Sequence, residues 1–201
     1  MFGTSLRPEA SLSGTLDAEA LAARIPPSYM VKGLFCSRFV QLLGSDYAKL
    51  APRLEAAPRD GRYLPFKDYP QADYTRIVLA TAAKQFPSMA LPEAVRRIAR
   101  DDITIFSSSM FGKIVLSLIG DVRSTLHRVP EAYQRIAPGP WLEVEDLDAR
   151  TARVTFHRYH GSIEYVLGQL EGIVLAFDRT PSVIVQRLNP ETLAFDVTHG
   201  G

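Results

Sequence analysis

The chain has 201 residues, of which 46% are hydrophobic and 22% are charged; these values are ordinary for a folded globular protein and exclude a disordered or fibrous chain. Its 23 Lys and Arg residues against 22 Asp and Glu residues give a formal net charge of only +1, so the chain creates no overall field that would attract a polyanion. We therefore expect no nucleic-acid partner.

Cys36 is the single cysteine, so no disulfide can form within the chain, and the sequence has neither a Cys-rich zinc site nor a CxxC redox motif. The first residues lack the basic start and apolar stretch of a secretory signal. The apolar run from Ile114 to Ile119 is too short to span a bilayer. These features predict a cytoplasmic protein with no membrane partner.

The N-terminal part of the sequence predicts a lead-in and two helices. Residues 1–15 are rich in Ser, Gly and small polar side chains, and we expect a disordered lead-in there. A short helix is predicted over Asp17–Arg24, before a pair of prolines. Apolar residues then recur every three or four positions from Val31 to Leu43, which predicts an amphipathic helix that ends at Gly44.

Prolines divide the next part of the chain into predicted helices. A proline- and aromatic-rich loop over Ala57–Pro70 precedes a helix from about Gln71 to Gln85. Pro92 stands where the first turn of the following helix tolerates a missing N–H. A nearly all-apolar helix is predicted over Met110–Ile119, and two short helices separated by Pro130 are predicted after it.

From Trp141 the hydrophobic period changes from that of a helix to that of a strand. Alternating residues around Val144 and Val154 predict a hairpin. A broad apolar stripe from Ile163 to Phe177 then predicts a helix laid across a sheet. Two further strands are predicted near Ser182–Leu188 and Leu193–Thr198.

The sequence thus predicts an α+β fold, with an N-terminal helical part followed by a C-terminal ββαββ antiparallel sheet unit. We expect a single domain over residues 16–201, with the helical part at about 16–139 and the ββαββ part at about 140–199.

The histidines offer little support for a metal site. His157 and His160 are closely spaced, but residues three apart on a strand point to opposite faces, so we expect no metal there. His127 is predicted to close a short helix, where the helix dipole stabilises an imidazolium, and this is a sufficient structural reason for its presence.

Catalytic residues cannot be assembled from the sequence. Cys36 lies beside an apolar helix stripe, where a buried and inert thiol is common. Ser107, Ser108 and Ser109 have no GxSxG motif around them. Adjacent carboxylates such as Asp101 and Asp102 usually face water. Because no nucleophile, base and orienting group can be combined, we expect no enzymatic activity.

Gly168 and Gly172 lie one helical turn apart, and each costs a helix about 1 kcal/mol relative to alanine. Close approach of another backbone would explain both glycines. The partner is either the sheet of the same domain, which we favour, or a second subunit.

Several short motifs lie in a fixed order along the chain. They are Val-Lys-Gly-Leu-Phe at 31 to 35, Asp73-Tyr74, Phe106-Ser-Ser-Ser-Met-Phe-Gly-Lys113, Pro130-Glu-Ala-Tyr133 and Gly161-Ser-Ile-Glu-Tyr-Val-Leu-Gly-Gln-Leu-Glu-Gly172. In these motifs, over nearly its whole length, the chain resembles an uncharacterised myxobacterial family of similar size. The resemblance implies a single-domain fold and no assigned activity.

A more distant resemblance is to the superfamily of haem nitric-oxide/oxygen-binding and vinyl-reductase-like ligand-binding domains, in which helices precede a similar strand-pair, helix, strand-pair ending. The segment Tyr165–Gly172 resembles the corresponding helix of that group, and Asp121-Val122 lies where its haem-ligating helix would run. This resemblance implies a ligand pocket between the helical part and the sheet, and a role in signalling.

The haem-binding residues of that superfamily do not carry over. Where the haem proteins have a Tyr-x-Ser-x-Arg propionate clamp, this chain has Phe156-His-Arg158-Tyr-His160. Near the position of the proximal histidine it has Arg123, with His127 one turn later. We therefore expect no bound cofactor; for haem, His127 would be the one candidate ligand.

Two functional hypotheses follow. The first is a non-enzymatic sensory or regulatory domain that binds a small, mainly apolar ligand between helices and sheet. Its pocket would combine an apolar lining from Met110, Phe111, Val115 and Leu118 with polar anchors from Arg123, His127 and Tyr133. The alternative is a protein-interaction or homodimerisation module without ligand, which would pair through the face of Gly168 and Gly172 or through a sheet edge.

Overall fold

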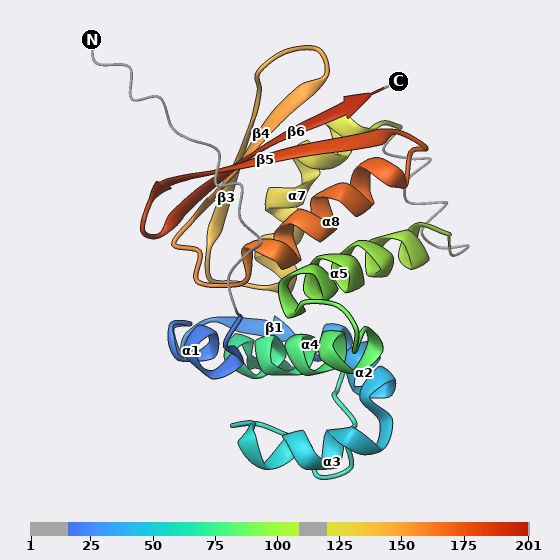
Figure 1. The fold of residues 1–201 in the computed structure, drawn as a ribbon. Coiled ribbons are helices and arrows are strands. Elements are labelled where there is room, and N and C mark those ends of the chain that lie inside the picture. The colour runs from blue at the N-terminus through green and yellow to red at the C-terminus, as the bar shows by residue number, and fades with distance from the viewer. Residues whose placement is uncertain (1–15, 109–119, 201) are drawn as a thin grey trace.

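The computed structural model describes residues 16–108 and 120–200 (Figure 1). The C-terminal sheet lies at one end of the molecule, with α7 (Val122–Ile136) and α8 (Ile163–Leu175) against one of its faces and α5 (Leu91–Ser108) beside α8. The next layer contains α1 (Ala18–Ala23), α2 (Gly33–Leu43) and α4 (Gln71–Gln85), and α3 (Tyr47–Leu50) lies at the opposite end (Figure 1). Two of the predicted segments, the lead-in over residues 1–15 and the apolar helix over Met110–Ile119, lie outside the described residues.

The N-terminal part is helical, as the sequence predicts, and also contains a small two-stranded sheet formed by β1 and β2. In chain order its elements are α1 (Ala18–Ala23), β1 (Met30–Lys32), α2 (Gly33–Leu43), the 3₁₀ turn Gly44–Asp46, α3 (Tyr47–Leu50), the 3₁₀ turn Ala51–Arg53, β2 (Asp68–Pro70), α4 (Gln71–Gln85) and α5 (Leu91–Ser108). Gly44 follows α2 with a positive φ of 52°, as expected for a glycine that ends a helix.

The C-terminal part confirms the predicted ββαββ unit and the α+β fold class. Its elements are α7 (Val122–Ile136), β3 (Trp141–Asp146), β4 (Thr151–His157), α8 (Ile163–Leu175), β5 (Thr180–Asn189) and β6 (Thr192–Gly200). The strands form one antiparallel sheet in the order β3-β4-β6-β5, so β3 and β5 are its edges. The turn between β5 and β6 is closed by the Asn189 side chain, which accepts a hydrogen bond from the Glu191 N–H at 3.0 Å.

Val31 belongs to a strand, although the sequence places it on the apolar face of the following helix. It pairs with Tyr69 in the antiparallel ladder of β1 and β2, and the helix begins only at Gly33. The tertiary pairing with β2 supplies backbone hydrogen bonds that a helix would otherwise provide, and it overrides the helical spacing of the apolar residues.

Pro130 lies inside α7, and the prediction of two short helices separated at this residue is wrong. A proline inside a helix costs about 3 kcal/mol, because its ring displaces the carbonyl one turn earlier and it lacks an N–H. The helix nevertheless continues, because residues on both sides of the proline share one apolar face: Leu126 is buried, and Val129 and Tyr133 pack against the sheet core. His127 therefore lies within a helix and not at its C-terminus.

The two glycines of α8 approach α5 of the same chain. A Cβ built at Gly168 would meet Arg96 and Ala99, and one built at Gly172 would meet Ile103 and Arg100. Neither the sheet nor a second subunit is the partner, so both predicted partners are wrong. The reason is geometric: α8 contacts the sheet with one face, and the glycines lie on the face that packs against α5.

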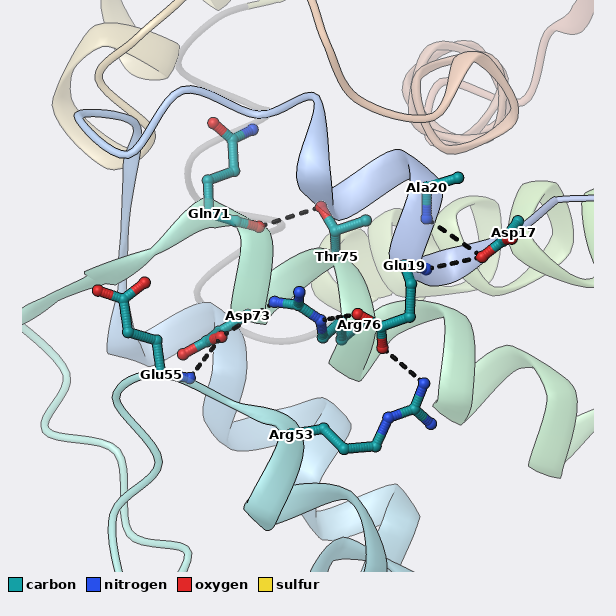
Figure 2. Close-up of polar contacts among 9 residues, drawn as sticks. All are labelled: Asp17, Glu19, Ala20, Arg53, Glu55, Gln71, Asp73, Thr75 and Arg76. Carbon is teal, nitrogen blue, oxygen red and sulfur yellow. Dashed lines mark hydrogen bonds and ion pairs between the residues drawn. The ribbon is translucent and has the colours of Figure 1, made fainter.

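A buried carboxylate joins the loop after α3 to α4 (Figure 2). Asp73 is only 1% exposed, and its two oxygens accept hydrogen bonds from the N–H groups of Glu55 at 2.9 Å and Ala56 at 2.8 Å. Arg76 extends this network to Glu19 on α1 at 2.9 Å. Because the buried charge has hydrogen-bond donors on both oxygens, it holds the loop against the helix without an unsatisfied group.

Two clusters of buried apolar side chains form the interior. One lies among the N-terminal helices and contains Phe39 and Ile77, and the other lies between α7, α8 and the sheet and contains Leu126 and Phe195. Tyr133 packs against both clusters, which places it where the helical part meets the sheet unit. Among the helices of the described ranges, none has the length and apolar character needed to cross a membrane.

Candidate functional site

A large apolar cleft lies between α2, α5, α7, α8 and β4. Its volume is about 650 Å³, within the range of typical small-molecule sites. Leu34 of α2 is among its lining residues and is 55% exposed. The side chains that line the cleft are mainly apolar, and they include Val129, Ala132, Tyr133 and Ile136 of α7 and Val166, Leu170 and Ile173 of α8.

The spacing of these residues explains why two helices face the same space. On α7 the lining residues fall at 129, 132, 133 and 136, and on α8 they fall at 166, 169, 170 and 173. Both sets follow the i, i+3, i+4, i+7 pattern that places side chains on one face of a helix. The cleft is therefore walled by two complete helical stripes and closed at the sheet side by Phe156 of β4.

One ion pair lies in the wall of the cleft. Arg38 of α2 forms an ion pair with Asp102 of α5, and both side chains are partly buried. Burial lowers the pKa of Arg38 from its ordinary value. Because the two charges neutralise each other, the cleft presents no net charge from its described lining residues, and it suits an uncharged ligand.

A smaller cavity adjoins the cleft. Its volume is about 70 Å³, and it shares Phe35, Tyr133, Ile136 and Gln169 with the cleft as lining residues. Its other polar lining residues come from α4, from the turn before α8 and from α8, and they are Gln71, Tyr74, Thr75, Tyr159, Ser162 and Tyr165. Among the lining residues that the structure describes, none carries a formal charge at neutral pH.

The tyrosines of the small cavity are ordered by hydrogen bonds and ring contacts. The hydroxyl oxygens of Tyr74 and Tyr165 lie 2.5 Å apart, and their rings meet edge to face. Tyr159 donates its hydroxyl proton to the Ser162 carbonyl at 2.8 Å. Burial raises the pKa of Tyr74 and Tyr165 above the ordinary value, so both hydroxyls are neutral at physiological pH.

Gln71, the first residue of α4, is buried with its side chain at the wall of the small cavity. Its backbone carbonyl accepts a hydrogen bond from Thr75 at 3.0 Å, while its side-chain amide points away from the network of Asp73 and Arg76 (Figure 2). The side-chain oxygen Oε1 has no hydrogen-bond partner among the described residues. Since an unpaired buried oxygen is costly, we expect this atom to accept a hydrogen bond from a donor that the described residues do not supply.

Tyr133 lies between the two spaces. It lines both, and its ring meets Phe156 edge to face at 5.6 Å between centroids. Burial raises the pKa of Tyr133 to about 12, although a hydrogen bond from the Gln71 side chain acts in the opposite direction. The hydroxyl is therefore a neutral group that can both donate and accept a hydrogen bond.

The structure brings together only part of the site suggested by the sequence. Tyr133 lines the cleft, but Arg123 and His127 lie on the outer side of α7, where both contact Asp146 of β3, at 2.6 Å and 3.2 Å respectively. This contact fixes their side chains away from the cleft. The four predicted apolar lining residues, Met110, Phe111, Val115 and Leu118, lie outside the described residues.

Sequence reasoning missed the residues of α2, α4 and α8 that line the two spaces. The spacing of its apolar residues does indicate the stripe on α8, but this pattern alone predicts packing against the sheet and no cleft. Gln71 and Gln169 gave no signal, since a single glutamine in a helix pattern is usually a surface residue. Their position depends on how α4 and α8 meet, which only the tertiary structure shows.

The chain has four histidines, all of them described, and none lines either space. His157 stacks on Trp141 with 3.8 Å between ring centroids, and His160 lies 5.8 Å from the ring of Tyr29. His199 lies on β6. Within residues 16–108 and 120–200, no group of three or more His, Cys, Asp or Glu side chains could hold a metal ion.

Comparisons with known proteins identify a sequence family and a shared fold. The profile of a family described as "Protein of unknown function (DUF2378)" matches residues 24–199. None of the curated proteins matches the chain.

Several solved structures have a similar fold. The H-NOX protein from S. oneidensis in the Fe(II)NO ligation state has a TM-score of 0.65 at 14% identity, over 85% of this chain and 99% of that one. The Fe(II) unliganded H-NOX protein from K. algicida has a TM-score of 0.63 at 14% identity, over 85% and 97%. A mutant of T. tengcongensis H-NOX has a TM-score of 0.61 at 17% identity, over 85% and 98%. Identities this low show a shared fold alone.

Haem is the group to test against this cleft, because one similar structure concerns heme distortion in the H-NOX family. The volume and the apolar lining would admit a flat apolar group, but the donors do not fit. No imidazole lines the cleft, and His127 points to Asp146. At the position of the expected propionate clamp, Phe156 is buried in the core and Arg158 is exposed. The described residues therefore do not fit a histidine-ligated haem.

Proposed function

The chain belongs to the DUF2378 family, and we propose that it is a non-enzymatic sensory or regulatory domain that binds a small, mainly apolar ligand between its helices and its sheet. The single cysteine is buried and free, which is consistent with a reducing compartment such as the cytoplasm. The ligand would occupy the cleft between α2, α5, α7, α8 and β4.

The observation that carries this proposal is the cleft itself. Two helices each place a four-residue stripe toward one space of about 650 Å³, and the charged pair in its wall is internally neutralised. A core would fill such a space with side chains, because protein interiors are close-packed. A space of this size with apolar walls and few polar groups is typical of ligand sites.

The shared fold supports the proposal without identifying the ligand. The similar S. oneidensis structure is an H-NOX protein in the Fe(II)NO ligation state, so the same fold holds a small-molecule site in that protein. In this chain the histidines lie elsewhere, and an organic ligand fits the described walls better than a histidine-ligated haem.

Ligand binding can be tested with a variant that fills the cleft. Ala132 lines the cleft from α7 and is exposed, so Ala132→Trp should place an indole in the cleft without displacing packed side chains. Native mass spectrometry of freshly purified protein should show a co-purifying small molecule in the wild type and none in Ala132→Trp. Ala83→Trp, at an exposed position of α4, is the matched control and should keep the molecule.

A wild-type protein with no co-purifying molecule, and with no rise in melting temperature when apolar compounds are added, would overturn the proposal, since a ligand that binds the folded state must stabilise it. If Ala132→Trp still retains the molecule, then the molecule binds outside the cleft.

A protein-interaction or homodimerisation module without ligand is the second candidate. It is favoured by β5, a ten-residue strand at the edge of the sheet, on which Ile184 is 46% and Leu188 43% exposed. Exposed apolar residues on a free edge favour pairing with another strand. The solution mass distinguishes this candidate: a ligand-free dimer that Ile184→Lys converts to a 22.3 kDa monomer would support it.

A further inference from the structure

We propose that the ligand is an uncharged amphiphile whose hydrogen-bond-donating end group, a hydroxyl, binds Gln71 in the small cavity while its apolar body lies in the cleft. This inference rests on the proposed function and specifies the chemical class of the ligand. It excludes both a plain hydrocarbon and a fatty acid.

The unpaired oxygen of Gln71 requires a donor. Gln71 is 9% exposed, it lines the small cavity, and its Oε1 has no partner among the described residues. A ligand hydroxyl would donate to Oε1, so that binding satisfies an oxygen for which the described residues supply no donor.

The charge of the small cavity selects a neutral end group. None of its described lining residues is an acid, a base or a histidine. Moving a carboxylate or an ammonium group into such a site without a partner of opposite charge is costly. Arg38, in the wall of the adjoining cleft, is already paired with Asp102. A hydroxyl avoids this cost, and the hydroxyl groups of Tyr133 and Tyr165 can exchange hydrogen bonds with it.

The size and position of the two spaces fit a molecule with a small polar end and a long apolar body. The small cavity holds about 70 Å³, which is room for a hydroxyl group and a neighbouring water, whereas the cleft holds about 650 Å³. They share lining residues, among them Phe35 and Tyr133, so the end group and the body would be adjacent. The rival explanation is that water alone satisfies Gln71.

Three probes with the same apolar chain separate these possibilities: 1-decanol, its methyl ether and decanoate. The ether keeps the oxygen but has no proton to donate, and decanoate carries a charge. Affinity is measured by displacement of the neutral fluorophore Nile red from the full chain. We expect 1-decanol to bind the wild type more tightly than either of the other two probes.

Gln71→Met removes the acceptor and keeps a side chain of similar length. This variant should lower the affinity for 1-decanol by roughly five- to tenfold, which is the effect of one lost hydrogen bond, and leave the affinity for the ether unchanged. Gln85→Met, an exposed glutamine at the other end of the same helix, should change neither affinity. Circular dichroism spectra and melting temperatures of both variants establish that they are folded.

The outcomes distinguish the two levels of the argument. If none of the probes binds the wild type, or if Ala132→Trp binds them equally well, the proposed function fails. If the probes bind in the cleft but Gln71→Met weakens decanol and ether equally or not at all, or if decanoate binds most tightly, the ligand class is wrong while the cleft remains a site. An absent or equal effect of Gln71→Met on decanol and ether would mean that water alone satisfies Gln71.

Discussion

Gly168 on α8 lies so close to Arg96 on α5 that a Cβ built at residue 168 would clash with the Arg96 carbonyl oxygen. Because that oxygen belongs to the backbone, it cannot move aside without shifting α5. We expect Gly168→Ala to lower the free energy of unfolding by at least about 2 kcal/mol despite the better helix propensity of alanine.

Urea denaturation followed by circular dichroism measures this loss. Gly200→Ala is the control, since a Cβ at residue 200 would lie 3.7 Å from Thr180, an ordinary contact. Equal stability of Gly168→Ala and wild type would mean that the two helices can separate freely, and that the contact does not fix the position of α8 beside the cleft.

The buried carboxylate of Asp73 holds the loop at Glu55 and Ala56 against α4. This carboxylate accepts the N–H groups of Glu55 and Ala56, and the side chain is 1% exposed (Figure 2). Asp73→Ala leaves two part-buried N–H donors without their acceptor and should cost about 2 kcal/mol of unfolding free energy, whereas Asp73→Asn keeps one acceptor and should cost less.

Asp101→Ala is the matched control for this measurement. Asp101 pairs with Arg97 at 3.6 Å on the surface of α5, with its side chain 43% exposed, and such a pair contributes about 0–1 kcal/mol. A loss at Asp73 no larger than the loss at Asp101 would show that the loop at Glu55 and Ala56 is held by other contacts.

Much of the architecture could be predicted from the sequence, because it depends on local periodicity. The change of period at Trp141, the helix over Gln71–Gln85 and the stop at Gly44 are all local signals, and the structure confirms them. Val31 and Pro130 were misplaced because each is governed by a partner distant in sequence: the strand at Tyr69 in one case, and the packed face of α7 in the other.

The candidate site was less predictable for the same reason. Its walls come from four helices and one strand, so no window of sequence contains it. Tyr133 is among the polar anchors that the sequence suggests, because binding pockets combine an apolar lining with a few polar groups, but the orphan oxygen of Gln71 has no sequence signature. His127 was misjudged because the direction of a helical side chain depends on which face is packed, and its face is turned to Asp146.

Asp121 caps the N-terminus of α7, and the stability that this cap contributes depends on pH. Its side chain accepts the Ser124 N–H at 2.6 Å, and this hydrogen bond lowers the pKa of Asp121 below its ordinary value of 3.8. A carboxyl group whose pKa is lower in the folded state stabilises the fold above the unfolded-state pKa, and this stability is lost as pH falls through the folded-state pKa.

Asp121→Ala should therefore cost about 1 kcal/mol near neutral pH, the usual value for a lost helix cap. The difference from wild type should shrink as the pH falls below the ordinary pKa of 3.8. Urea titrations of both proteins between neutral and acid pH measure this. A difference that is constant across that range would mean that the cap does not depend on ionisation.

Cys36 should be unreactive in the folded protein. The side chain is fully buried on α2, and burial raises the pKa of its thiol to about 12. Since the thiolate is the reactive form, a disulfide-exchange reagent such as dithionitrobenzoate should label the thiol in denaturant and leave it unlabelled in buffer at pH 8. Rapid labelling of the native protein would show that α2, one wall of the cleft, opens readily.

The last prediction concerns haem binding. The fold resembles that of H-NOX proteins, but the described side chains that line the cleft include no histidine to bind the iron. The similar solved structures are H-NOX proteins, some of them in iron(II) forms, but in this chain His127 contacts Asp146 and lies outside the cleft. Tyr133 does line the cleft, but burial raises the pKa of its hydroxyl to about 12 and disfavours the phenolate that would bind iron.

We therefore expect haem added to the purified protein to give no Soret band typical of histidine ligation, and we expect His127→Ala to leave the visible spectrum unchanged. Asp146→Ala removes the partner of the His127 imidazole. It is the control that tests whether this contact is what keeps His127 away from the cleft. A Soret band in the wild type that His127→Ala abolishes would show that α7 rotates its outer face toward the cleft, and would replace the organic ligand by haem. A band that survives His127→Ala would instead indicate apolar capture of haem in the cleft without an imidazole ligand.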